Sequence, residues 1–246
     1  MLLCLSNRRS ARRAAARQLD GGSPFPDRKA RSGKSGWNGK GKRRGQVART
    51  TASHATDEEI ALARAALGKR NLVFVGLMGA GKSAIGRLIG QWLGVPFIDS
   101  DTEIERVSRM TISDLFANYG EEEFRALETR VLERLMKGGP RVVSTGGGAF
   151  MNEITRDVIK RKGLSVWLKA DLDVLWDRVS RRDTRPLLKT EHPKQTLKAL
   201  LDKRYPVYAE AEITVISREA PKEAVALDVI RALADHQAMH IQEAHK

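Results

Sequence analysis

The sequence has little cysteine, few aromatic residues and no long hydrophobic run. Its one cysteine, Cys4, has no second cysteine to pair with, so no intramolecular disulfide can form, as is usual in a reducing cytoplasm. The longest strongly apolar stretch, residues 71–81, is far shorter than the roughly 20 residues of a membrane-spanning helix. The apolar start, residues 1–5, is short and precedes the arginines, which is the reverse of a secretory signal. We therefore expect a cytoplasmic protein with no membrane partner.

Acidic residues are nearly absent from the first fifty positions. Asp20 and Asp27 stand there against fourteen Lys and Arg, a net charge of +12, while the rest of the chain carries only +2 of the total of +14. This segment has no apolar periodicity and cannot bury enough surface to offset its ordering entropy. We predict a disordered basic tail over residues 1–55; a rarely used upstream start and a transit peptide are alternatives. With only Phe25 and Trp37 available for base stacking, we expect no nucleic-acid partner.

From Asp57 onward, apolar runs alternate with helical patterns. This alternation is typical of βαβ units built on a parallel sheet, and hydrophobic residues, at 41% of the chain, allow a sizeable core. We find no internal repeat and predict one domain over residues 56–246. The expected strands are Leu72–Val75, Val95–Ile98, Val142–Ser144, Leu164–Leu168 and Ile213–Ile216, and the expected helices lie near residues 57–67, 82–93, 102–118, 121–137, 153–161, 172–180, 195–209 and 222–235.

The segment Gly76–Ser83 (GLMGAGKS) matches the phosphate-loop pattern G-x-x-x-x-G-K-[ST] in full and lies between an expected strand and an expected helix. In this setting backbone N–H groups surround phosphate oxygens, and the helix N-terminus adds positive potential. Lys82 should reach the β- and γ-phosphates, and the Ser83 hydroxyl should ligate Mg²⁺. A glycine turn formed by chance is the alternative. The candidate ATP contacts are Gly79, Ala80, Gly81, Lys82, Ser83 and Ala84.

Two carboxylates, Asp99 and Asp101, follow the expected strand Val95–Ile98. Ligands of open α/β sheets gather at the carboxyl ends of the strands, so both acids should face the site. A kinase needs one carboxylate near the metal and another that orients or deprotonates the attacking hydroxyl. The alternative is that both acids only cap the helix that follows.

Three further patterns bear on the phosphate acceptor. Arg125 and Glu128 share one helix face at i, i+3, although an ordinary surface pair has the same spacing. The triple glycine 146–148 follows an expected strand and allows the backbone to approach a ligand closely, as a bare turn also would. A basic segment within a predicted lid, about residues 178–195, either closes an arginine on the transferring phosphoryl group or is a solvated helix end. Its arginines are Arg178, Arg181, Arg182 and Arg185.

In this combination and order the motifs resemble those of the shikimate kinase family, over about residues 71–234 and thus nearly the whole predicted domain. The resemblance implies that Asp99 lies beside the Mg²⁺ site and that Asp101 contacts the acceptor hydroxyl as the base. Through the Phe-Arg-x-x-Glu motif it implies that Arg125 binds the carboxylate of shikimate and that Glu128 supports the ring site. The basic tail lies outside the resemblance.

The resemblance implies further contacts at the triple glycine and in two arginine-containing segments. Gly147 and Gly148 should donate backbone N–H groups to shikimate. Arg204, just before a Pro-x-Tyr segment, should be the second carboxylate-binding arginine, and Arg185, immediately before Pro-Leu, should approach the phosphates. The candidate catalytic residues are therefore Asp101, Lys82 and Arg185, and the candidates for stacking on adenine are Arg181 and Arg182.

The implied fold is a three-layer α/β/α arrangement with a central five-stranded parallel sheet, a P-loop kinase architecture similar to that of nucleoside-monophosphate kinases. The implied reaction transfers the γ-phosphoryl group of ATP to the 3-hydroxyl of shikimate, with Mg²⁺ as cofactor, in the biosynthesis of chorismate and aromatic amino acids. Two arginines, an acid and glycine amides also match the groups of a small carboxylate with three hydroxyls. We expect a monomer. The alternatives are a kinase acting on gluconate or a nucleoside monophosphate, and a nucleotide-dependent nucleic-acid-binding protein working through the basic tail.

Overall fold

The computed structural model of the chain describes residues 55–181, 188 and 190–244. The predicted tail, apart from its last residue, and residues 182–187 and 189 of the predicted lid lie outside these residues. The division of the chain into tail and domain therefore stays a prediction. Within the described part, no helix is both long enough and apolar enough to cross a membrane.

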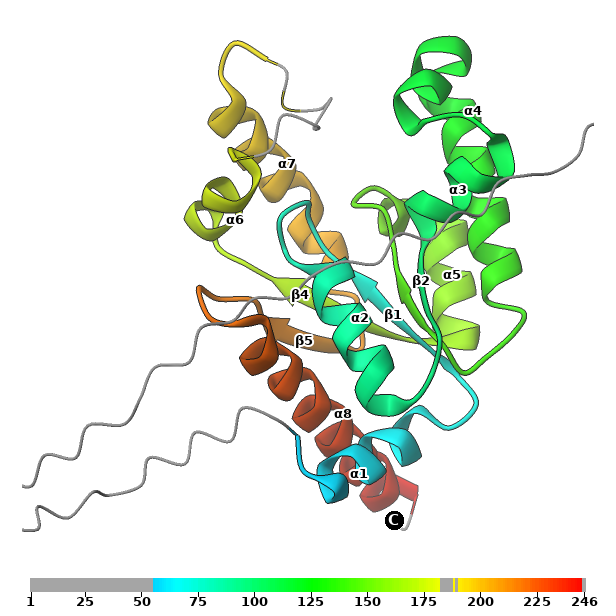
Figure 1. The fold of residues 1–246 in the computed structure, drawn as a ribbon, viewed down its shortest axis with the longest axis vertical. Helices are drawn as coiled ribbons and strands as arrows, with labels where there is room; N and C mark the ends of the chain where they lie inside the picture. Colours follow the sequence, from blue (N-terminus) through cyan, green and yellow to red (C-terminus); the bar gives the residue numbers. More distant parts are fainter. Residues whose placement is uncertain (1–54, 182–187, 189, 245–246) are drawn as a thin grey trace, which may run out of the picture. The chain divides into compact units, whose positions relative to one another are not determined.

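Five parallel strands form a sheet in the order β2-β3-β1-β4-β5 (Figure 1). All five residues of the central strand β1 are buried, which explains why the strands appear in the sequence as continuous apolar runs. The α/β fold class with a five-stranded parallel sheet is thereby confirmed. The strands are β1 (Asn71–Val75), β2 (Phe97–Asp99), β3 (Val142–Ser144), β4 (Gly163–Lys169) and β5 (Ile213–Ile216).

The chain crosses the sheet in opposite directions on the two sides of β1. It passes from β1 to β2 through α2 (Lys82–Leu93) and from β3 to β4 through α5 (Glu153–Lys162). Because crossovers between parallel strands are right-handed, these opposite directions place α2 and α5 on opposite faces of the sheet. Figure 1 shows α2 and α8 (Lys222–Ala244) in front of the sheet. The loop between β1 and α2 consequently lies at the middle of the carboxyl edge, between the ends of β3 and β4.

One predicted helix, residues 102–118, is wrong because the chain interrupts it. The helix α3 (Ser100–Ser108) ends at Arg109, whose φ is 57°, and α4 (Ile112–Leu135) begins after Thr111. The Thr111 hydroxyl accepts a hydrogen bond from the Asp114 N–H at 3.1 Å, which caps the new helix and fixes its start. The break predicted before residue 121 is present as a kink within α4 at Gly120, where φ is 79° and ψ is 177°.

Among the other boundaries, those of β2 and α8 also differ from the prediction. The strand β2 begins at Phe97 and includes Asp99, because it pairs with β3 only between these two residues. The helix α8 continues to Ala244 instead of ending at residue 235. The remaining elements are α1 (Asp57–Leu67), α6 (Leu172–Val179), α7 (Pro193–Tyr208) and the short 3₁₀ helix η1 (Ala149–Met151).

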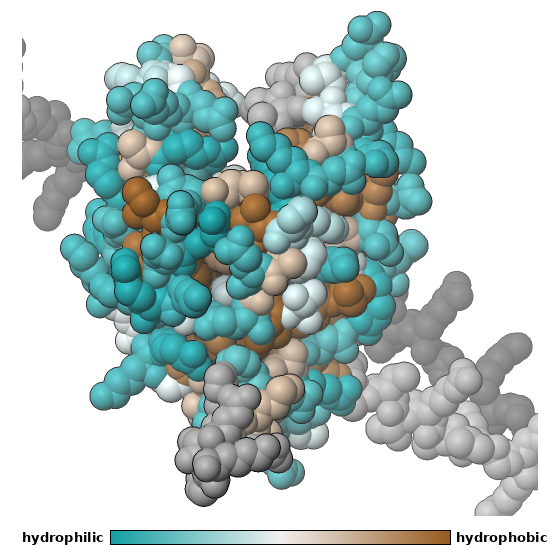
Figure 2. Space-filling view, turned by 180° about the vertical axis from the view of Figure 1, so that it is seen from behind, coloured by the Kyte–Doolittle hydropathy of each residue, from teal (hydrophilic) through white to brown (hydrophobic). Residues whose placement is uncertain are grey.

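The described surface exposes few large hydrophobic side chains, and they lie on separate elements. Figure 2 shows a largely hydrophilic rear face with hydrophobic residues in small groups. The exposed large hydrophobic residues are Leu62 on α1, Tyr119 on α4, Ile154 on α5, Ile216 on β5 and Met239 on α8.

Candidate active site

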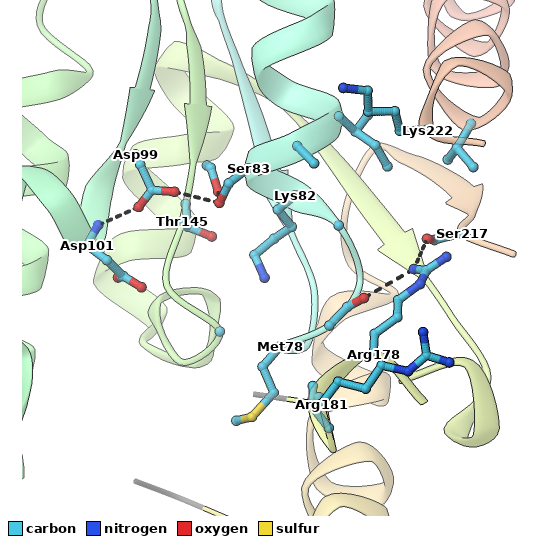
Figure 3. Close-up of a pocket in the computed structure, with 18 of the residues that line it drawn as sticks. Met78, Lys82, Ser83, Asp99, Asp101, Thr145, Arg178, Arg181, Ser217 and Lys222 are labelled. Atoms are coloured by element: carbon cyan, nitrogen blue, oxygen red, sulfur yellow. Dashed lines mark hydrogen bonds between the residues drawn. The ribbon is translucent and has the colours of Figure 1, made fainter. Parts of the chain in front are cut away.

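A cavity of about 520 Å³ lies at the carboxyl edge of the sheet (Figure 3). Asp99 and Asp101 line one end, Lys222 lines the other, and the phosphate loop runs between them. The structure therefore brings the loop and the two acids together at one cavity. Of the predicted ATP contacts, Ala80 is fully buried and does not line the cavity, whereas Gly79, Gly81, Lys82, Ser83 and Ala84 do.

The side chain of Lys82 lies inside the curve of the phosphate loop. Its Nζ donates hydrogen bonds to the Gly76 carbonyl at 2.8 Å and to the Leu77 carbonyl at 3.1 Å, and the residue is only 9% exposed. The loop makes its turn through positive φ angles of 86° at Gly79 and 93° at Gly81. A cationic group is thus held at the centre of a loop of backbone amides, which is the arrangement that binds phosphate.

Asp99 both caps α3 and contacts the phosphate loop. Its Oδ1 accepts a hydrogen bond from the Asp101 N–H at 3.1 Å, and its Oδ2 accepts one from the Ser83 hydroxyl at 2.6 Å. The Ser83 hydroxyl also lies 3.2 Å from the Ser144 hydroxyl at the end of β3. The capping alternative is therefore correct for Asp99, and it coexists with a place in the site.

The carboxylates of Asp101 and Glu128 approach the same side of Gly146. A methyl group added at Gly146 would lie 2.7 Å from Asp101 Oδ1 and 2.7 Å from Glu128 Oε1, closer than real side chains approach one another. The Gly146 N–H donates to the Ser100 hydroxyl at 3.1 Å, which holds this backbone beside the two acids. A larger residue here would have to displace both carboxylates, and the absent side chain lets them come together.

Glu128 is buried, so the surface-pair alternative for Arg125 and Glu128 is wrong. Glu128 is 2% exposed, and its Oε2 accepts a hydrogen bond from Arg125 Nη1 at 2.7 Å. Among the described residues its Oε1 has no hydrogen-bond partner. Burial raises the pKa of Glu128 above its usual value, although the positive charge of Arg125 acts in the opposite direction. Arg125 also pairs with a second carboxylate, that of Glu121, which is exposed and accepts a hydrogen bond from Arg125 Nη2 at 3.1 Å.

Two guanidinium groups converge on the triple glycine. Arg125 lies so close to Gly148 that an added methyl group would meet Nη1 and Nη2 at 2.5 Å. From the other side Arg204 Nη1 donates to the Gly147 carbonyl at 2.9 Å, and the Tyr208 hydroxyl donates to the same carbonyl. Burial raises the pKa of Tyr208 to about 12, so this hydroxyl remains a donor at neutral pH. The structure thus brings together Arg125 and Arg204, which are 79 positions apart in the sequence.

The predicted lid arginines have different environments. Arg178 bonds to the phosphate loop through the Gly79 carbonyl, at 3.1 Å from its Nη1. Arg181 lines the cavity but is largely exposed and pairs with Asp177 at 2.7 Å. Arg182 and Arg185 lie outside the described residues, so their predicted contacts with ATP stay predictions.

Several residues of the site were missed by the sequence interpretation. Ser144 is the last residue of β3, and Ser217 directly follows β5, so both lie where ligands of such sheets bind. The same rule that selected Asp99 could have selected them. Ser100 and Gly146 carried no such signal, because their contact depends on how two separate loops pack. The contact of Arg178 with the loop was also missed, because arginines at the end of a helix are commonly solvated and make no such contact.

Comparison with known proteins identifies close relatives. A family model described as shikimate kinase matches residues 78–234. The shikimate kinase of Rhizobium meliloti (strain 1021) is 71% identical over 175 residues, which cover 71% of this chain and 91% of that protein. The shikimate kinase of Brucella suis is 54% identical over 173 residues, or 70% of this chain and 86% of that protein.

Solved structures give the same relation. The shikimate kinase from Acinetobacter baumannii in complex with shikimate has a TM-score of 0.67 and 36% identity, covering 70% of this chain and 97% of that one. The shikimate kinase from Aquifex aeolicus has a TM-score of 0.60 and 34% identity, covering 66% of this chain and 95% of that one.

The contact at Gly146 gives a test of the site geometry. The Gly146→Ala substitution should lower turnover in a kinase assay by about 5- to 150-fold, since overpacking of about 1–3 kcal/mol must push the two carboxylates apart. The matched control is Gly138→Ala, whose methyl group would meet only the flexible end of Arg141. Turnover and urea unfolding should be measured for both variants. Equal turnover in the two would show that the carboxylates can move aside freely.

Proposed function

We infer the activity of this chain from its relatives: it belongs to the shikimate kinase family. As a shikimate kinase it transfers the γ-phosphoryl group of ATP to the 3-hydroxyl of shikimate, giving 3-phosphoshikimate and ADP, a step toward chorismate and aromatic amino acids. The observation that carries the assignment of its residues is the convergence of Arg125 and Arg204 on the triple glycine, next to Asp101 and the phosphate loop.

The carboxylate of shikimate is proposed to bind between the two arginines. Both guanidinium groups are held in place by protein acceptors, Arg125 by Glu128 and Arg204 by the Gly147 carbonyl. Such fixed, charged donors suit a carboxylate, because charge-assisted hydrogen bonds are about twice as strong as neutral ones. The Gly147 and Gly148 N–H groups are proposed to complete this part of the site, and their backbone is accessible because neither residue carries a side chain.

Asp101 is proposed to act on the acceptor hydroxyl. Its side chain lines the cavity at the end opposite Lys222, and its backbone is fixed by the cap from Asp99. In the reaction it would orient the hydroxyl and accept its proton as the oxygen attacks phosphorus. Lys82 would offset charge on the transferring group, and Arg185, outside the described residues, keeps its predicted place against the phosphates.

The oxygen atoms around Ser83 fit Mg²⁺. Ser83, Asp99 and Ser144 bring together hydroxyl and carboxylate oxygens, the donor type that Mg²⁺ prefers. Among the described residues no cluster of three or more His, Cys, Asp or Glu could hold a metal alone. We therefore propose that Ser83 ligates the ion and that Asp99 supports it, with water and phosphate oxygens as the other ligands. When bound, Mg²⁺ supplies charge neutralisation at the β- and γ-phosphates.

The exposed large hydrophobic residues of the described part lie on separate elements and form no joint apolar surface for a second copy of the chain. This feature supports a protein that works as a monomer. Since ATP is the co-substrate, we propose that it acts in the cytoplasm.

The choice of acceptor is tested by ADP release. The full chain with Mg·ATP should release ADP rapidly with shikimate and near background with gluconate or AMP. The Lys82→Ala variant should lose turnover by orders of magnitude, because it removes the charge directed at the transferring group, and it serves as the blank. A gluconate or AMP rate that matches the shikimate rate would refute the assignment of the acceptor.

The two arginines should affect one substrate only. Arg125→Ala and Arg204→Ala should each weaken shikimate binding by roughly ten- to a hundredfold, the equivalent of one charge-assisted hydrogen bond, and leave Mg·ATP binding nearly unchanged. Titration calorimetry measures both affinities. Arg130→Ala, on the exposed side of α4, is the control and should change neither. Equal losses for ATP and shikimate would place these arginines elsewhere in the site.

The two acids should separate in their dependence on metal and acceptor. Asp101→Asn should cut turnover deeply while Mg·ATP binding persists, since an amide can hydrogen-bond a hydroxyl but cannot take its proton. Asp99→Asn should raise the Mg²⁺ concentration needed for half-maximal turnover. Titrations with Mg²⁺ and shikimate on both variants measure these effects. The opposite pattern would reverse the two roles, and full activity in both variants would leave neither acid with a role in the reaction.

A further inference from the structure

Two side chains from outside the phosphate loop hold its outer side. Arg178, on α6, donates from Nη1 to the Gly79 carbonyl at 3.1 Å and to the Ser217 hydroxyl at 2.9 Å (Figure 3). The Ser217 hydroxyl in turn donates to the Ala80 carbonyl at 2.9 Å. Ser217 is 1% exposed, so this hydroxyl is shielded from competing water. Two consecutive carbonyls of the loop are therefore fixed from the same side.

These bonds also fix the direction of the loop amides. A trans peptide is planar, and its C=O and N–H point in opposite directions. The peptide between Gly79 and Ala80 is held at both ends, because the Ala80 N–H donates to the Leu77 carbonyl at 3.2 Å. In the next peptide the Ala80 carbonyl is turned out toward Ser217, so the Gly81 N–H points the opposite way. Gly81 lines the cavity, which is where a phosphate oxygen needs a donor.

The groups that hold the loop are themselves anchored to the sheet. The Ser217 N–H donates to the Lys169 carbonyl at 2.6 Å, which ties the end of β5 to the end of β4. Arg178 Nη2 donates to the Arg218 carbonyl at 2.7 Å. The tip of the loop packs directly on α6, since a methyl group added at Gly79 would lie 2.8 Å from Val179 Cγ1. The loop is thus supported by α6 and by the ends of the neighbouring strands β4 and β5.

We propose that Arg178 and Ser217 are positioning residues that hold the phosphate loop in its binding conformation by fixing the Gly79 and Ala80 carbonyls. They act on the phosphates through the loop backbone and not by direct contact. The inference rests on the proposed function of this loop as the ATP phosphate site. Both residues also line the cavity, so the competing explanation is that they contact the base or ribose of the nucleotide.

Inorganic tripolyphosphate separates these explanations, because it has phosphates but neither base nor ribose. Affinities for Mg·ADP and for Mg-tripolyphosphate should be measured by titration calorimetry on the full chain. Ser217→Ala should weaken both ligands by the same factor, about 5- to 10-fold, as expected for the loss of about one hydrogen bond. Arg178→Met, which keeps a side chain of similar length without its donors, should weaken both by at least about tenfold.

The controls exclude a general loss of structure. Ser180→Ala, an exposed serine next to α6, makes the same chemical change and should alter neither affinity. Shikimate affinity should stay within about twofold of wild type in Ser217→Ala and Arg178→Met, because the two fixed carbonyls belong to the proposed ATP phosphate site. A lower shikimate affinity in both variants would indicate a general structural role and overturn the proposal.

Two further results for the variants would overturn the proposal. Weaker binding of ADP with unchanged tripolyphosphate binding would assign the two residues to the nucleoside and overturn the proposal, as would unchanged binding of both ligands. If wild type itself bound neither ligand, the proposed function of the loop would fail, and this inference with it.

Discussion

The carboxylate of Asp99 uses both of its oxygens to join parts of the chain that meet only at the edge of the sheet. One oxygen accepts from the Asp101 N–H and starts α3, and the other accepts from Ser83 at the start of α2. Ser83 also contacts Ser144 at the end of β3, and Ser100 accepts from the Gly146 N–H. The loops that follow β1, β2 and β3 are thereby held in one arrangement. The distance between the phosphate side and the acceptor side depends on it, and transfer between two bound groups is sensitive to errors of about 1 Å.

The segments that follow β4 and β5 also contact the phosphate loop, but from its other side. They do so through the hydrogen bonds of Arg178 and Ser217. The central loop is therefore held between two sets of hydrogen bonds, one reaching it through Ser83 and the other through the Gly79 and Ala80 carbonyls. The strand order explains why the loop is held from two sides, since β1 lies in the middle of the sheet with β3 and β4 on either side of it. Any rotation of one side relative to the other would have to break one of the two sets.

Much of the fold could be predicted from local pattern, whereas the buried contacts of the site could not. Continuous apolar runs gave the strands, because both faces of this sheet are covered, and the phosphate loop has a pattern of its own. The interruption at residues 109–111 was missed because the Thr111 cap lies within an otherwise helical stretch. Glu128 illustrates the larger limit. Its spacing from Arg125 is the same for a surface pair and for a buried one, and only the packing of Gly146 and Gly148 against these side chains distinguishes the two. Arg204 could be assigned to the site only through the family resemblance, since nothing local connects it with Arg125.

Burying Glu128 lowers the stability of the folded protein, yet the site keeps this residue. Because the pKa of this carboxyl is higher in the folded protein than in the unfolded chain, its contribution to stability is largest below the unfolded pKa and is lost as the pH rises through the folded pKa. The buried carboxyl also has one oxygen without a hydrogen-bond partner among the described residues, which typically costs about 1–3 kcal/mol. An apolar residue of similar volume would relieve this strain but would leave the guanidinium of Arg125 without its buried partner. Stability and substrate binding therefore place different demands on this one position, since the carboxyl that holds Arg125 is itself unfavourable to bury.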